Sequence, residues 1–259
     1  MTRAKRHLRT LLAAIFVLLS AAPAIAVQHV VSLNLCSDHL LVLLAPEQAT
    51  ALSPLAHDPA LSFVAARAAS IPLVRDDAES VLRLHPDVVL AGDYGARTTA
   101  ALLQAEGLRV ERLDMPQDFS AIRAQTRQVA ALLDVPQRGE ALLATMDAAL
   151  ASVSKPAHPI KAIAWEPRAY TAGPGTLMDA VLHAAGLINI STGRVLGREA
   201  LLRAKPELLV VPQSPAFPSL ATNMLDSPVL AGIPHRALPP ALTICAGPFT
   251  AAAVALLAQ

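Results

Sequence analysis

Short aliphatic runs alternate with segments of helical periodicity through the first half of the chain. The runs are too short for buried helices, so they predict β-strands over residues 29–33, 49–53, 88–91 and 108–113. Helical spacing of apolar residues covers 38–44, 60–69, 77–84 and 98–106. Because strands and helices take turns, the pattern predicts a mainly parallel sheet covered by helices on both faces.

The pattern becomes almost purely helical at residues 119–133 and 137–153, and Pro136 separates the two helices. The alternation then resumes, with strands expected over 160–165, 208–211 and 237–245, and helices over 176–185, 198–204 and 248–257. We therefore expect an α/β fold of two lobes with mainly parallel sheets, joined by a single long helix. The expected boundaries are 27–135 for the N-terminal lobe, 136–156 for the linking helix and 157–259 for the C-terminal lobe.

The first 26 residues have the three parts of a secretory signal peptide. Residues 11–22 form an uncharged apolar run, and Ala24-Ile25-Ala26 is a small-x-small cleavage site. A positively charged segment precedes the apolar run; its cations are Arg3, Lys5, Arg6 and Arg9. The apolar run is shorter than the roughly 20 residues that a membrane-spanning helix needs. We expect residues 1–26 to be removed and the rest to be exported as a soluble monomer.

Composition and charge narrow the possible functions. Of the 259 residues, 54% are hydrophobic and the mean hydropathy is +0.46, which excludes a disordered chain. The formal net charge is +1 at pH 7, and loss of the four leader cations brings it to −3. A nucleic-acid partner is not expected, because the mature chain has no basic block and only 3% of the residues are aromatic.

The two cysteines, Cys36 and Cys245, would lie in an oxidising compartment after export. They permit one disulfide, which would close a very long loop and restrict the unfolded chain. The alternative is two separate buried thiols, because sequence spacing does not show whether the two residues are within reach of each other.

No catalytic motif stands out, and we expect neither an enzyme nor a cofactor. The sequence lacks a Gly-x-Ser-x-Gly turn and a phosphate-binding loop with Lys. An exported hydrolase would need an activated nucleophile beside a base, such as Ser37 near His39. The histidines form no H-x-x-x-H pair, so no metal site is predicted, although Cys36 and His39 share one helical face and distant ligands could converge.

Polar and aromatic residues follow three predicted strands, at the end where ligands bind in open α/β sheets. They are Asn34, Cys36 and Ser37 after the first strand, Asp93 and Tyr94 after 88–91, and Trp165 and Tyr170 at the end of 160–165. The single Trp and both Tyr of the chain are among them. A flat aromatic wall with few polar groups suits a large, partly apolar ligand. Packing within its own lobe is the competing interpretation for each ring.

One pattern occurs twice along the chain. Glu79 lies seven residues before Pro86, and Glu199 lies seven residues before Pro206. In both copies an Arg occupies the same place, an acidic residue follows the Pro, and an aliphatic strand comes next. The repeat favours two lobes with a duplicated layout.

Taken in order, these segments resemble the substrate-binding proteins of ABC importers for cobalamin and ferric siderophores. These are two-lobed periplasmic proteins of the class III type. The resemblance covers nearly all of the mature chain. It rests on Val31-Ser-Leu-Asn34, Glu79 to Leu90, the helical linker, Trp165 to Gly173, Leu187-Ile-Asn189 and Glu199 to Val210.

The resemblance implies a periplasmic protein that captures a metal chelate between its lobes and delivers it to a membrane permease with a cytoplasmic ATPase. The chelate would be a cobalamin-type corrinoid or a ferric siderophore. In this family an exposed Glu on each lobe docks onto permease arginines, and Glu79 and Glu199 occupy those places. The resemblance places the ligand between the lobes, in contact with Asn34, Cys36, Ser37, Asp93, Tyr94, Trp165 and Tyr170.

The sequence departs from the siderophore binders in one respect. Hydroxamate-siderophore binders commonly use a cleft Arg and several aromatic residues. This chain offers Arg97 and Arg168 but few aromatic residues. Haem would need an axial Tyr or His, for which Tyr94, Tyr170 and His57 are the candidates. A haem-binding protein and a binder of bare Zn or Mn ions are therefore kept as alternatives.

Overall fold

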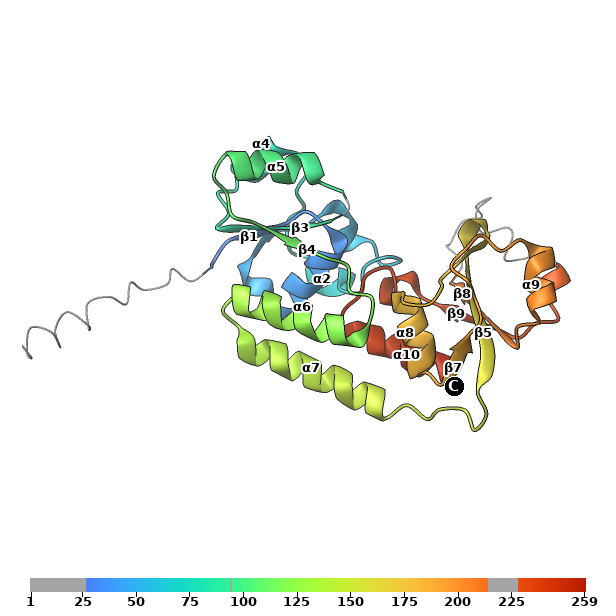
Figure 1. The fold of residues 1–259 in the computed structure, drawn as a ribbon. Helices are drawn as coiled ribbons and strands as arrows, with labels where there is room; N and C mark the ends of the chain where they lie inside the picture. Colours follow the sequence, from blue (N-terminus) through green and yellow to red (C-terminus); the bar gives the residue numbers. More distant parts are fainter. Residues whose placement is uncertain (1–26, 94, 214–227) are drawn as a thin grey trace, which may run out of the picture.

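The computed structural model describes residues 27–93, 95–213 and 228–259, and it confirms two α/β lobes built around two separate sheets (Figure 1). The predicted signal peptide, residues 1–26, lies outside the described residues, as does Tyr94. Among the helices of the described residues, none combines the length and the apolar character that crossing a bilayer requires.

The sheet of the N-terminal lobe has four parallel strands in the order β2-β1-β3-β4. The strands are β1 (Val30–Ser32), β2 (Ala49–Ala51), β3 (Val88–Gly92) and β4 (Val110–Leu113). One face packs on α2 (Leu35–Leu44) and α6 (Phe119–Leu132), and the other on α4 (Ala78–Leu82) and α5 (Arg97–Ala105). Both faces of β3 are buried, which explains its uninterrupted aliphatic sequence.

The sheet of the C-terminal lobe is centred on β5 (Ile160–Glu166). Its other strands are β6 (Tyr170–Thr171), β7 (Leu187–Asn189), β8 (Leu208–Pro212) and β9 (His235–Leu238). Only β6 runs antiparallel, and it pairs with the end of β5. The helices α8 (Leu177–Ala184) and α10 (Ala251–Leu257) cover one face, and α9 (Arg198–Ala204) covers the other.

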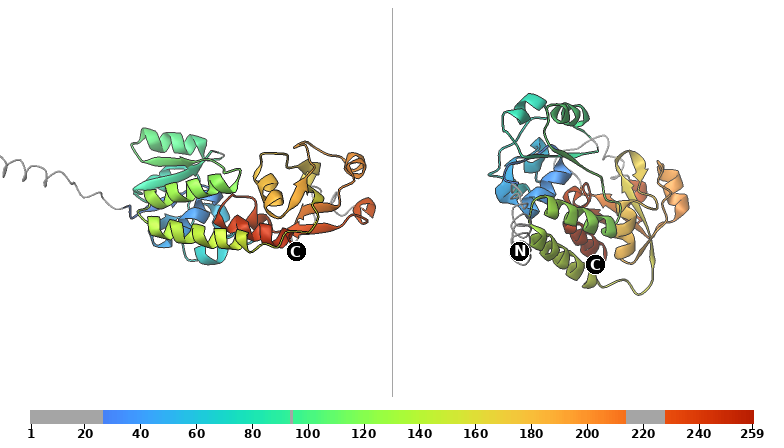
Figure 2. Two further views of the ribbon diagram at one scale, coloured as in Figure 1. Left: turned by 60° about the horizontal axis from the view of Figure 1, so that its bottom comes forward. Right: turned by 60° about the vertical axis from the view of Figure 1, so that its left-hand side comes forward.

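The linking helix α7 (Pro136–Ala151) lies alongside α6 and reaches toward α10, as all views agree (Figures 1 and 2). Gly139 allows the close approach to α6, because a Cβ there would lie 2.6 Å from the Cβ of Ala130. Residues 152–159 then lead to β5 outside any helix, so the helix ends five residues before the predicted 156.

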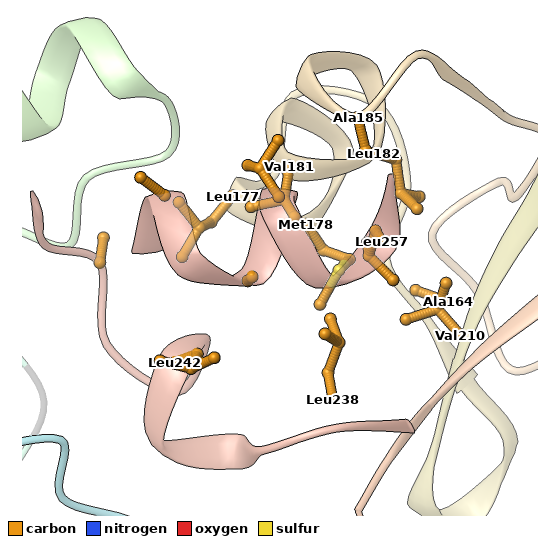
Figure 3. Packing of buried hydrophobic residues seen from close by; sticks show 14 of the residues in the cluster. Ala164, Leu177, Met178, Val181, Leu182, Ala185, Val210, Leu238, Leu242 and Leu257 are labelled. Atoms are coloured by element: carbon orange, nitrogen blue, oxygen red, sulfur yellow. The ribbon is translucent and has the colours of Figure 1, made fainter. Parts of the chain in front are cut away.

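The chain end packs against the first lobe, so the two lobes share part of one hydrophobic core. That core joins Ile122 of α6 and Met146 of α7 to Val181 of α8 and Val254 of α10. Figure 3 shows the α8 side of this cluster, with Met178 and Leu238 pointing toward one another. The C-terminal segment therefore connects the lobes a second time, beside α7.

Several boundaries differ from the predicted ones. The strand expected over 237–245 ends at Leu238, because Pro239 and Pro240 have no N–H to donate and Pro240 begins a 3-10 turn. The helix expected over 60–69 shrinks to α3 (Ala65–Ala68). The short strands β6 and β7 were not expected. The remaining turns are 3-10 helices at Pro46–Gln48, Pro54–His57, Pro167–Ala169, Pro228–Leu230, Pro240–Leu242 and Pro248–Thr250.

Candidate functional site

The carboxyl ends of β1, β3 and β4 meet at one edge of the N-terminal sheet and enclose a small hollow of about 40 Å³. We call it the N hollow. Its lining consists of Asn34, Cys36, Gly92, Asp93, Leu113, Asp114, Met115 and Gln125. Hollows at this edge are where open α/β sheets bind ligands.

Asn34 holds the mouth of the N hollow in shape. Its side-chain oxygen accepts a hydrogen bond from the Cys36 N–H at 2.8 Å, which caps the start of α2. Gly92 at the end of β3 leaves room for this side chain, because a Cβ at Gly92 would lie 2.8 Å from the Asn34 Nδ2. The predicted contacts Asn34, Cys36 and Asp93 all line this hollow.

Two carboxyl groups of the N hollow, those of Asp93 and Asp114, lie next to each other. A hydrogen bond to the Asp93 side chain, together with the charge on Asp93, raises the pKa of Asp114. The Gln125 Nε2 donates to the Asp114 carbonyl oxygen at 2.5 Å, and the Arg97 Nε donates to the Asp93 carbonyl oxygen at 2.9 Å. The predicted cleft residue Arg97 therefore supports the backbone behind the hollow and does not line it.

A larger hollow of about 380 Å³ lies at the carboxyl ends of β5, β8 and β9. We call it the C hollow. Its lining consists of Glu166, Pro167, Met178, Val210, Val211, Pro212, Leu238, Pro240, Thr243 and Ile244. Apolar side chains dominate this lining, and Glu166 is its one charged residue within the part of the chain that the structure describes. Burial raises the pKa of the Glu166 carboxyl.

A disulfide joins Cys36 to Cys245, with the sulfur atoms 2.10 Å apart and the Cα atoms 5.2 Å apart. The structure therefore bears out the disulfide interpretation of the two cysteines. Cys36 lines the N hollow, and Ile244, the neighbour of Cys245, lines the C hollow. The two hollows thus lie on either side of one covalent link between the lobes.

Two of the predicted ligand contacts are wrong. Trp165 is fully buried, and its Nε1 donates to the Leu196 carbonyl oxygen at 3.0 Å. Side chains alternate along β5, so Trp165 faces α9 together with Ile163. Ser37 is also buried, and its hydroxyl bonds Ser32 and the Asn34 carbonyl oxygen. Neither side chain reaches a hollow.

Of the two tyrosines predicted to contact the ligand, the structure describes only Tyr170. Tyr170 lies on β6 opposite Glu166, and 57% of it is exposed, beside the C hollow but outside its lining. Tyr94 lies outside the described residues. Arg168 precedes Tyr170 and is exposed, with a left-handed backbone at φ 61°.

Sequence reasoning missed residues that follow other strand ends. Asp114 and Met115 come directly after β4, so the strand-end rule could have found them. Glu166 is the last residue of β5, next to the Trp165 that drew attention instead. Met178 and Gln125 come from helices and had no such signal.

The two repeated glutamates occupy similar places on the two lobes. Glu79 lies in the first turn of α4 and Glu199 in the first turn of α9. Their side chains are 82% and 91% exposed, and each contacts the Arg four residues later, at 2.9 Å and 3.8 Å. Figure 1 shows these helices on the outer sides of different lobes.

Among the described residues, the serine, histidines and cysteine considered for hydrolysis or metal binding do not come together in such a centre. His39 accepts a hydrogen bond from the Phe63 N–H through Nε2, and burial lowers its pKa to about 4. Ser37 bonds Ser32 and not His39. The His57 Nε2 lies 2.8 Å from the Ala68 carbonyl oxygen, away from both hollows. Within the described ranges no three metal-binding side chains gather.

A family model for periplasmic binding proteins matches residues 30–234. The chain is similar to the periplasmic haem-binding protein RhuT of Roseiflexus sp. RS-1 in apo form, with 25% identity, a TM-score of 0.73, and coverage of 90% of this chain and 98% of that chain.

A periplasmic haem-binding protein from Pseudomonas aeruginosa is similar at 24% identity and a TM-score of 0.70, over 90% of this chain and 91% of that chain. BhuT in complex with two haems is similar at 24% identity and a TM-score of 0.68, over 89% and 96%. A search of curated proteins gave no significant match.

The match over residues 30–234 covers the N-terminal sheet, α6, α7 and the C-terminal sheet except β9, which begins at His235. Proteins of this family bind a substrate for an ABC importer and are not enzymes. The chain belongs to the periplasmic binding protein family, as the substrate-binding component of an ABC importer.

Proposed function

We propose that this protein captures a metal chelate, either a cobalamin-type corrinoid or a ferric siderophore, and delivers it to the importer's permease. The proposal is carried by the two hollows that flank the Cys36–Cys245 disulfide. Because the two hollows belong to different lobes, a macrocycle or a ferric chelate that fills both would contact both lobes.

The lining chemistry supports a bulky guest with an apolar face. Met178, Val210 and Leu238 form apolar walls in the C hollow, against which a flat ring system can pack. Asn34, Asp114 and Gln125 bring hydrogen-bonding groups to the N hollow. A ligand with an apolar ring system and polar groups at its edge would suit the apolar C hollow and the polar N hollow.

Haem is the second candidate. The similar solved structures include periplasmic haem-binding proteins, and one of them is a complex with two haems. Tyr170 supplies an exposed phenol beside the C hollow, and a tyrosine is one of the axial ligands that haem iron accepts. Bare Zn or Mn ions have less support, because the described residues form no cluster of three ligands.

The test adds cyanocobalamin, haem and a ferric hydroxamate in turn to the purified protein and follows each absorption spectrum and binding heat. One of the three is expected to bind with one equivalent per chain. Ile244→Trp should fill the C hollow and abolish that binding. Leu202→Trp is the matched control, because Leu202 is about as exposed as Ile244 but lies on α9. Binding of haem alone would favour the second candidate, and failure of all three chelates to bind the wild type would refute both.

Permease docking is the second half of the proposed function. We assign it to Glu79 and Glu199, one on each lobe, because both carboxylates are exposed and each is the second residue of its helix. Carboxylates in such positions can pair with arginines of a membrane partner and steer the approach of the two proteins.

A further inference from the structure

The charged groups that line the two hollows are all carboxyl groups. They are Asp93 and Asp114 in the N hollow and Glu166 in the C hollow. Among the described residues, neither lining includes a Lys, an Arg or a His. The described linings of the two hollows therefore oppose negative charge on a guest.

Glu166 is the most constrained of the three carboxyl groups. It ends β5 on the side opposite Trp165, and the rest of its hollow comes from β8, β9, Met178 of α8 and the turn that follows β9. None of those lining residues titrates, and no described residue bonds the Glu166 carboxyl group. Burial raises its pKa, so the group has lost hydration without gaining a partner among the described residues.

We propose that Glu166 is a specificity-determining residue that rejects chelates with carboxylate groups at their edge and selects chelates with neutral N–H donors. The inference rests on the proposed function. An anionic edge placed in the C hollow would meet a carboxylate in a poorly hydrated, apolar setting, where repulsion between like charges is strong. A carboxamide edge would instead donate the hydrogen bond that Glu166 lacks.

The experiment compares wild type with Glu166→Gln by calorimetry against two probes. Cyanocobalamin carries neutral carboxamides around its macrocycle, and haem carries two carboxylates at one edge. Glu166→Gln keeps the shape and an acceptor oxygen but removes the charge. It should weaken cyanocobalamin binding by roughly tenfold, the effect of one charge-assisted hydrogen bond. Haem binding should become tighter, because the repulsion is gone.

Opposite changes for the two probes separate a specificity role from damage to the fold, which would weaken both. Glu106→Gln, an exposed carboxylate at the end of α5, is the control and should change neither affinity. Lowering the pH toward the raised pKa of Glu166 should make the wild type behave like Glu166→Gln, because the carboxyl group becomes neutral.

The inference is overturned if Glu166→Gln shifts both affinities in the same direction or shifts neither. It is also overturned if the wild type binds haem more tightly than cyanocobalamin, and that result favours haem, the second candidate of the proposed function, over a corrinoid. If the wild type binds neither these probes nor a ferric hydroxamate, the proposed function itself fails.

Discussion

Phe249 stacks on Phe63, with ring centroids 4.7 Å apart and an angle of 13° between the ring planes. Phe63 belongs to the N-terminal lobe, and Phe249 lies four residues after Cys245 in the segment that ends the chain. The His39 ring meets Phe249 edge to face, with ring centroids 4.9 Å apart and an angle of 90° between the planes. This ring stack, the disulfide and α7 are three links between the lobes, and they favour a stiff hinge.

Replacing Phe249 by Ala should lower the free energy of unfolding by about 3 kcal/mol, because the ring is 7% exposed and its loss leaves a cavity. Phe63→Ala should cost about 1 kcal/mol, since 42% of Phe63 is already exposed. Chemical denaturation followed by circular dichroism measures both values. Equal losses in the two variants would contradict the assignment of Phe249 to the shared core.

Removing the disulfide with the double substitution Cys36→Ser and Cys245→Ser should lower stability by roughly 4–5 kcal/mol. The link spans 209 residues of sequence, and long loops lose the most chain entropy when they are closed. Urea unfolding of the double variant should coincide with that of the reduced wild type. An oxidised wild type that unfolds at the same urea concentration as the variant would show that the link adds nothing.

Asp38 and His39 are buried neighbours whose pKa values are shifted in opposite directions. Burial raises the pKa of Asp38 to about 7, although its carboxylate accepts hydrogen bonds from the Ser53 hydroxyl at 2.5 Å and the Ser53 N–H at 3.2 Å. The folded protein therefore binds this proton more tightly than the unfolded chain does. The stabilisation that Asp38 contributes to the free energy of unfolding is greatest below about pH 4 and is lost as the pH rises to about 7.

His39 gives the opposite pH dependence. Its folded pKa of about 4 lies below the ordinary value of 6.5, so stability is lost as the pH falls from 6.5 to 4. The two effects oppose each other in the wild type. The unfolding free energy of Asp38→Asn minus that of the wild type should increase as the pH rises from 4 to 7. The unfolding free energy of His39→Gln minus that of the wild type should decrease as the pH rises from 4 to 6.5. Flat difference curves would show that neither group titrates as the structure indicates.

Charge reversal at the docking residues, Glu79→Arg with Glu199→Arg, should abolish transport into cells and leave ligand affinity unchanged. Both side chains are on the outer surface and outside both hollows, so only the contact with the permease is altered. Uptake of radiolabelled ligand and calorimetry with the purified protein measure the two properties. Glu106→Arg provides a surface control of the same charge change. Normal uptake in the double variant would refute the docking assignment.

The two-lobe α/β fold was predictable because strands and helices alternate with different periods of apolar residues. Some element boundaries were also predictable from local chemistry. Pro136 favours the first position of a helix, and α7 begins there in both the prediction and the structure. The strand after residue 237 was overextended because the apolar residues after Pro240 form a turn and not a strand. Apolar character alone does not separate the two.

The site was predictable in part. Parallel strands end at the same sheet edge, so Asn34, Cys36 and Asp93 could be grouped without coordinates. The error at Trp165 has a physical cause. Both faces of β5 are buried at Ala162, Ile163, Ala164 and Trp165, so hydrophobicity does not alternate along the strand and cannot tell which side a residue faces.

The sequence by itself determined the class of fold, the order of the elements and the residues at most strand ends, because these depend on local periodicity and on neighbours along the chain. Only the tertiary structure decided that Cys36 meets Cys245, that Phe63 meets Phe249, and that Glu166 faces the C hollow while Trp165 turns away from it. These relationships join residues far apart in the chain, or depend on which face of a buried strand a side chain occupies. Packing settles both, and no local pattern encodes them.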